Sequence, residues 1–170
     1  MQNFAIRPNG GLVLLQSFIF TLDKPGPNAV RQEAPHPHQV LTDPTGKFIA
    51  TPDLGADFIR LFRIDPYTSL LTELPSVIAP PGSGPRHGDF LRNEHGTFYF
   101  LLTELTNEVI TYKVTYGAHY SSIHFQELFR QSQFGPDAAP AGAFASEIFV
   151  SVSSFDSFYL TARSNIHIAR

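Results

Sequence analysis

The sequence predicts an all-β fold, specifically a β-propeller built from four-stranded antiparallel blades. Apolar residues fall in short runs that are rich in Phe, Ile, Val and Tyr and are broken by Gly, Pro, Asn and Asp, which is the pattern of strands joined by turns. The runs also repeat, because matching Asp53, Glu104 and Arg163 gives periods of 51 and 59 residues. A four-stranded blade needs about 40–45 residues, and its half-apolar faces must be covered by neighbouring blades around an axis.

The repeat units divide the chain into four segments in order. These are the end of a preceding blade with a loop (1–34), a blade (35–79), a second blade (80–130), and a loop with a partial blade (131–170). The clearest predicted strands are Lys47–Thr51, Phe58–Ile64, Thr97–Thr103, Val109–Thr115 and Phe158–Thr161. Gly- and Pro-rich loops at Ala79–Pro85 and Gln131–Gly142 separate the units and account for the surplus length.

Composition excludes several classes of protein. Twelve Lys and Arg against fifteen Asp and Glu give a formal charge of −3, so a polycation that binds nucleic acid by charge is excluded. The absence of cysteine excludes a disulfide framework, a thiol nucleophile and a zinc ribbon. No apolar stretch is long enough for a spanning helix, and we expect no membrane partner. The apolar region Leu12–Leu22 is interrupted and lacks a cleavage site, so a cytoplasmic location is favoured over secretion.

Polar residues interrupt the apolar pattern at two equivalent positions in each unit. The first position, at the start of the innermost strand, holds His38, His87 and Glu147. The second, at the end of the next strand, holds Asp53, Glu104 and Arg163. Because the innermost strands of a propeller line a central channel, equivalent positions from different blades converge there. The sequence therefore predicts a site at the axis.

Several of these residues also have structural interpretations. Asp53 precedes Leu54-Gly55 and could cap a turn. Glu147 could form a structural salt bridge with Arg163. His36 and His38 have the spacing of metal ligands, but flanking prolines distort the strand and no third ligand follows at a diagnostic spacing. These alternatives stay open from the residues alone.

The loop before the second blade carries a more specific signal. Gly82-Ser83-Gly84-Pro85 is followed directly by Arg86 and His87. A Gly-rich loop that delivers an Arg and a His to a channel rim suits recognition of a carboxylate or a phosphate. It does not open a helix, so nucleotide binding is not implied.

At these residues the chain resembles the lactonase-type seven-bladed β-propellers, a family that includes propeller-type 6-phosphogluconolactonases and 3-carboxy-cis,cis-muconate cyclases. The matching motifs are Pro35–Asp65, Pro80–Phe90, Phe98–Val114 and, more weakly, Ala145–Asn165. The resemblance implies that the chain supplies about three and a half blades, or half of the ring. It departs from the family at Val152–Asp156, where an S-P-D-G-type turn is usual, and at T-A-R, where S-N-R is familiar.

The resemblance also implies an activity. Carried over by motif, His38, Arg86, Glu104 and Arg163 are the catalytic residues. The repeat positions that converge on the channel add His87, Glu147 and Asp53 as expected substrate contacts. The expected reaction hydrolyses or forms a small lactone by acid–base chemistry, on an anionic lactone or carboxylic acid. The two arginines would bind the substrate, Glu104 would act as general base, and His38 would be its acid–base partner or polarise the carbonyl. No cofactor or metal is expected.

Two other hypotheses compete with this one. The first is a non-catalytic propeller scaffold or inactive fragment, in which an open half-ring exposes apolar blade faces and self-associates. The second is a metal-dependent lactonase that uses His36, His38 and His87.

Overall fold

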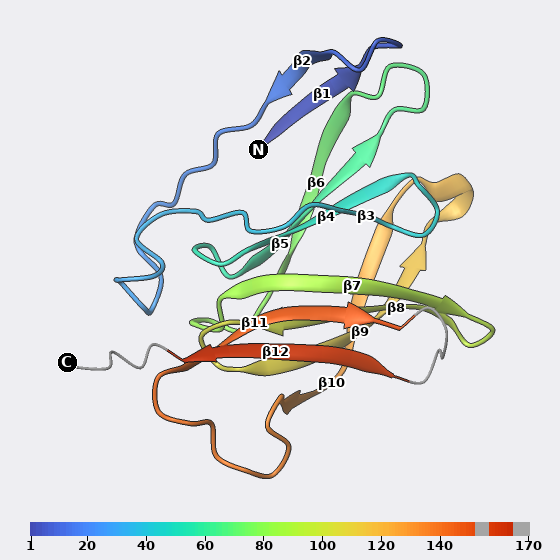
Figure 1. Ribbon diagram of the computed structural model, residues 1–170. Helices are drawn as coiled ribbons and strands as arrows, with labels where there is room; N and C mark the ends of the chain where they lie inside the picture. Colours follow the sequence, from blue (N-terminus) through green and yellow to red (C-terminus); the bar gives the residue numbers. More distant parts are fainter. Residues whose placement is uncertain (152–156, 165–170) are drawn as a thin grey trace.

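The computed structural model describes residues 1–151 and 157–164, and strands dominate them (Figure 1). The strands are β1 (Gln2–Ile6), β2 (Leu12–Ser17), β3 (Leu41–Thr42), β4 (Phe48–Asp53), β5 (Phe58–Ile64), β6 (Leu71–Ile78), β7 (Pro85–Asn93), β8 (Gly96–Thr103), β9 (Glu108–Tyr116), β10 (Ile123–Ser132), β11 (Ala143–Val150) and β12 (Phe158–Ser164). One short 3₁₀ turn, Ala118–Tyr120, joins β9 to β10. In the described residues no helix has the length and apolar character needed to cross a bilayer.

The strands pair in the order in which they occur along the chain. β3–β6 and β7–β10 form two four-stranded antiparallel sheets, and β1–β2 and β11–β12 form two hairpins. The predicted all-β architecture of four-stranded antiparallel units is therefore confirmed. The predicted departure from the family at Val152–Asp156 lies outside the described residues.

The two complete sheets bury their facing side chains against each other. Phe48, Ile59 and Leu61 of the first sheet share one core cluster with Tyr99 and Ile110 of the second. In Figure 1 the β7–β10 sheet lies between the β3–β6 sheet and the β11–β12 hairpin. This is the stacking that two half-apolar faces require, and it brings the innermost strands of successive units together.

Corners at the ends of β4 and β8 tie each sheet to the loop that begins the next one. Asp57 and Asn107 occupy the equivalent corner position with φ of 54° and 56°, a left-handed conformation that Asn and Asp tolerate. The Asp57 carboxylate accepts the backbone N–H groups of Gly82 and Gly84 at 2.6 and 2.9 Å. Asn107 donates its side-chain N–H to the carbonyl of Ala143 at 2.9 Å. The loop ahead of Arg86 is therefore fixed by an acid of the preceding blade.

Two β-bulges set the side-chain directions of the innermost strands. β7 carries the extra residue Arg86 and β11 carries the extra residue Ser146, each breaking the register with the next strand. Directly after the bulges, His87 pairs with β8 and Glu147 pairs with β12. In the first blade, the backbone N–H of His38 donates to a carbonyl of β4, which is the corresponding strand. These three residues therefore occupy the same position in three successive units, as the sequence predicts.

Candidate active site

Glu104 is the buried centre of a cluster of charged side chains. It follows β8 directly, and its backbone N–H donates to the carbonyl of Gly84 at 2.8 Å. Its side chain is fully buried, and its Oε2 accepts a hydrogen bond from Arg86 Nε at 2.7 Å. Its Oε1 accepts hydrogen bonds from Arg163, at 3.3 Å, and from Arg31. In the described part of the chain, three guanidinium groups thus surround one carboxylate.

This surrounding keeps Glu104 ionised. Burial alone would raise the pKa of its carboxyl group, but the hydrogen bond and charge of Arg31 and the charges of Arg163 and Arg86 outweigh it, so that the pKa is lowered. A carboxylate with a lowered pKa and both oxygens engaged by guanidinium groups is a weak proton acceptor. The geometry therefore does not favour the predicted general-base role and favours one in which Glu104 orients the arginines.

Arg31 is a member of the site that the sequence did not indicate. It lies in the loop after the first hairpin, where its backbone N–H donates to the carbonyl of Asn28 at 3.0 Å. The next residue, Gln32, is fully buried and donates to the Leu54 carbonyl at 2.9 Å and to Asp57 at 2.8 Å. Gln32 therefore anchors the loop that presents Arg31. The loop lies outside the repeat, so no periodic pattern could single out this arginine.

His38, His87 and Glu147 meet beside this cluster. His38 Nδ1 lies 3.1 Å from His87 Nε2, and His87 Nδ1 lies 2.5 Å from Glu147 Oε1. Partial burial, with the charges of Arg86 and His87, lowers the pKa of His38, against the opposing charge of Glu104. The structure thus brings six of the seven predicted residues into one region. Glu147 contacts His87 there, while Arg163 contacts Glu104, so the predicted alternative of a Glu147–Arg163 pair gives way to these contacts.

Asp53 is the exception, and its predicted role in substrate binding needs correction. Asp53 is the last paired residue of β4, and Thr103 is the last paired residue of β8. In each blade the next residue, Leu54 or Glu104, donates its backbone N–H to a carbonyl of the segment that begins the blade. The position equivalent to Glu104 is therefore Leu54. A shift of one residue turns a side chain to the opposite face of the sheet, so Asp53 does not belong with Glu104 and Arg163.

The Asp53 carboxylate is instead used inside its own blade. It is fully buried and accepts a hydrogen bond from Arg60 Nε at 2.7 Å. It also accepts the backbone N–H groups of His36, at 2.7 Å, and of Ala56, at 3.2 Å. The alternative in which Asp53 caps a turn is therefore the one that the structure shows.

The histidines proposed for a metal site do not converge. His36 Nε2 lies 2.8 Å from Glu33 Oε1, whereas His38 turns toward His87. Within residues 1–151 and 157–164, no group of three or more His, Cys, Asp or Glu side chains is arranged to hold a metal ion. The hypothesis of a His36–His38–His87 metal site therefore has no geometric support in that part of the chain.

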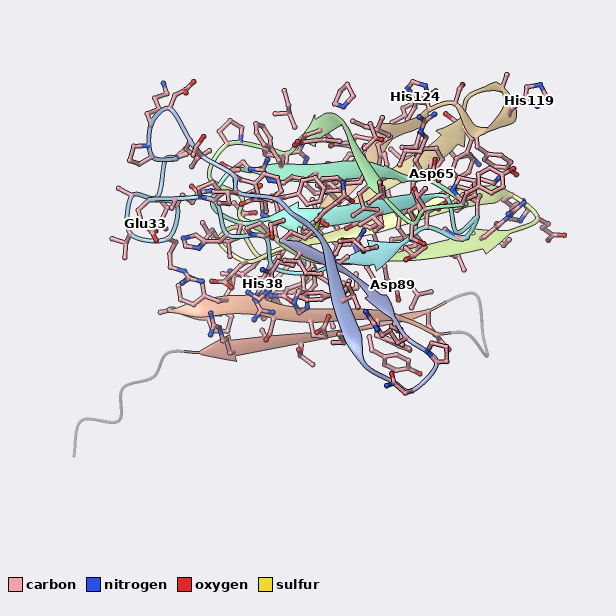
Figure 2. The ribbon with its side chains drawn as sticks, turned by 90° about the horizontal axis from the view of Figure 1, so that it is seen from above. Glu33, His38, Asp65, Asp89, His119 and His124 are labelled. Atoms are coloured by element: carbon pink, nitrogen blue, oxygen red, sulfur yellow. The ribbon has the colours of Figure 1, made fainter. Side chains whose placement is uncertain are left out.

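The charge of the cluster indicates what it can bind. Three guanidinium groups face one carboxylate, and the side chains of Arg31 and Arg163 are each nearly half exposed. In Figure 2, His38 and Glu33 lie toward the same end of the sheets, while Asp65 and His119 lie toward the other. Exposed, pre-oriented guanidinium groups beside the imidazole of His38, whose pKa is lowered, suit an anionic ligand that undergoes proton transfer.

Comparison with known proteins agrees with this architecture. The family model described as "Lactonase, 7-bladed beta-propeller" matches residues 1–169. A relative from Arthroderma benhamiae, named a probable 6-phosphogluconolactonase, is 40% identical over 114 residues, which cover 66% of this chain and 29% of the relative. The 6-phosphogluconolactonase of Bacillus subtilis is 38% identical over 80 residues, covering 47% of this chain and 22% of its own length.

A crystal structure from Bacteroides fragilis superposes with a TM-score of 0.79 at 28% identity, covering 96% of this chain and 44% of that one. The chain thus spans less than half the length of the proteins it matches. The predicted β-propeller is confirmed by the matched model and by this superposition. On the match of residues 1–169, the chain belongs to the lactonase family of seven-bladed β-propellers.

Proposed function

We propose that this chain carries the site of a lactonase that hydrolyses a small anionic lactone, with a phosphorylated sugar lactone as the favoured substrate. The observation that carries the proposal is the cluster of Arg31, Arg86 and Arg163 around the buried Glu104. Guanidinium groups bind phosphate and carboxylate groups through paired, charge-assisted hydrogen bonds. Two of the matched relatives carry the name 6-phosphogluconolactonase, which agrees with such a substrate.

The residues divide the work between binding and proton transfer. The arginines hold the anionic group, and Glu104 keeps them oriented. The Nε2 atom of His38 accepts a proton from water as the water oxygen attacks the lactone carbonyl carbon. The ring C–O bond then breaks, the departing oxygen takes that proton back from the His38 imidazolium, and the new carboxylic acid releases its own proton to solvent.

Lactone hydrolysis is favoured over the related cyclisation because the named relatives are lactonases. The related ring closure by a muconate-type cyclase, in which a carboxylate oxygen adds to a carbon–carbon double bond, would draw on the same residues and stays an alternative of lower rank. The cytoplasmic location and the self-association through open blade faces stay predictions. Exposed apolar side chains such as Ile6 and Leu12 on the first hairpin, and Phe149 and Tyr159 on the last, are consistent with the latter.

A hydrolysis assay tests the proposal. The chain should accelerate the opening of 6-phosphogluconolactone above the rate measured without protein, and Arg86→Gln should remove most of that acceleration. Arg130→Gln is the matched control, because Arg130 pairs with Glu127 on β10, away from the cluster. Absence of any acceleration, together with no binding of the product, would contradict the proposal and favour the non-catalytic scaffold.

A further inference from the structure

A chain of contacts links three blades at the innermost strands. His38 Nδ1 and His87 Nε2 are 3.1 Å apart, with ring centroids 5.0 Å apart and the ring planes inclined by 66°. His87 Nδ1 lies 2.5 Å from Glu147 Oε1, although the carboxylate oxygen lies off the direction of an aligned N–H bond. The side chain of His87 is 14% exposed, so it lies inside the chain of contacts, while Glu147 is 49% exposed at its outer end.

The contacts determine where the protons sit. A ring nitrogen this close to a carboxylate oxygen must carry a proton, because two lone pairs would repel each other. With its proton on Nδ1, neutral His87 has a bare Nε2 that accepts a hydrogen bond. His38 must then donate from its own Nδ1, and its Nε2 is left without a proton. The carboxylate thus selects the tautomer of both histidines in turn.

We infer that His87 and Glu147 are positioning residues that hold His38 in the Nδ1–H tautomer, with Nε2 free to take a proton from the attacking water. The tautomer itself is independent of the reaction, and its use in hydrolysis rests on the proposed function. This inference replaces the expected direct contacts of His87 and Glu147 with substrate. The bulges insert Arg86 and Ser146 directly before these residues, and His87 and Glu147 take the place that His38 holds in the first blade.

The arrangement also implies a response to pH. His38 faces Arg86 and His87 of β7, Glu104 after β8, and, through His87, Glu147 of β11. At neutral pH its lowered pKa leaves it unprotonated, mainly because of burial and the charge of Arg86. When the pH falls below that lowered pKa, the Nε2 atom of His38 takes a proton from solvent and can no longer accept one from the attacking water. Acid therefore removes the base.

Nuclear magnetic resonance of the ¹⁵N-histidine-labelled chain tests the tautomers directly, because protonated and bare ring nitrogens have different ¹⁵N shifts. Spectra of His38→Gln and His87→Gln assign the signals. At pH 7.5 we expect both histidines in the Nδ1–H form, and in Glu147→Ala we expect His38 to shift toward the Nε2–H form that a free imidazole prefers. The control is Glu73→Ala, because the Glu73 carboxylate is 50% exposed and lies beside Arg60 on β5.

A wild-type His38 in the Nε2–H form, or His38 shifts that are the same in Glu147→Ala as in Glu73→Ala, would overturn the inference. Kinetics separates it from the proposed function. Glu147→Ala should lower kcat about 10- to 100-fold with little change in KM, the range seen when a group that orients a metal-bound histidine is removed. If the tautomers are as expected but no lactone is hydrolysed, the proposed function fails alone. If hydrolysis is strong and Glu147→Ala leaves kcat and its pH profile unchanged, the positioning role fails alone.

Discussion

Replacing Asp53 by Asn tests whether this residue is structural. The change keeps the side-chain shape and an oxygen for the backbone N–H groups of His36 and Ala56, but places a neutral amide opposite Arg60 Nε. Because Arg60 is only 8% exposed, this change leaves its guanidinium group buried without its charged partner. Breaking a buried ion pair from one side costs about 3–5 kcal/mol. The same arginine lies 4.0 Å from Glu73, which is half exposed, and such a pair contributes about 0–1 kcal/mol.

The assay is equilibrium unfolding in urea, monitored by far-ultraviolet circular dichroism. Asp53→Asn should lower the free energy of unfolding by about 3–5 kcal/mol, whereas Glu73→Gln, acting on the same arginine, should change it by less than about 1 kcal/mol. Adding Arg60→Met to Asp53→Asn should recover part of the loss, because the unpaired buried charge is removed while the amide oxygen still accepts the N–H groups of His36 and Ala56. A stable Asp53→Asn chain with weakened binding of 6-phosphogluconate would refute the structural role and restore the original prediction.

Three further predictions follow from other contacts. Gly88→Ala should destabilise the chain by about 1–3 kcal/mol, because an added Cβ would meet the hydroxyl of the buried Tyr99, and Tyr99→Phe should relieve part of the loss in urea unfolding. Because the pKa of Glu104 is lowered below its ordinary 4.5, its stabilisation is present above that pH and is lost as the pH falls through the folded-state pKa. The difference in stability between wild type and Glu104→Gln should therefore shrink in unfolding curves recorded below about pH 4.5. Gln32→Ala should cost about 1–3 kcal/mol and weaken binding of inorganic phosphate by loosening the loop that holds Arg31; unchanged affinity would contradict that account.

Periodicity predicts the fold well because blade stacking imposes the same apolar pattern on every unit. The ends of β5, β8 and β9 lie within one residue of the predicted strands. The equivalence of His38, His87 and Glu147 is confirmed for the same reason, since the innermost strand carries a polar residue at the same place in each blade.

The errors arise where a single residue decides the direction of a side chain. Matching the acids Asp53 and Glu104 by residue type gives a period of 51 residues. The strand pairing shows that the position equivalent to Glu104 is Leu54, so the period between these two blades is 50 residues. Arg31 was missed because a non-repeating loop carries it, and its position depends on tertiary hydrogen bonds of Gln32. Neither the strand register nor these tertiary contacts can be predicted from the local sequence pattern.

The most direct test of the central account is calorimetric titration of the chain with 6-phosphogluconate. We predict that Arg31→Gln, Arg86→Gln and Arg163→Gln each weaken binding by about 10- to 100-fold, since a charge-assisted hydrogen bond contributes about 1.5–3 kcal/mol and 1.4 kcal/mol is a factor of ten. The Arg130→Gln control should bind like the wild type. Equal affinity in all four variants would contradict the assignment of the guanidinium cluster around Glu104 as the anion-binding site.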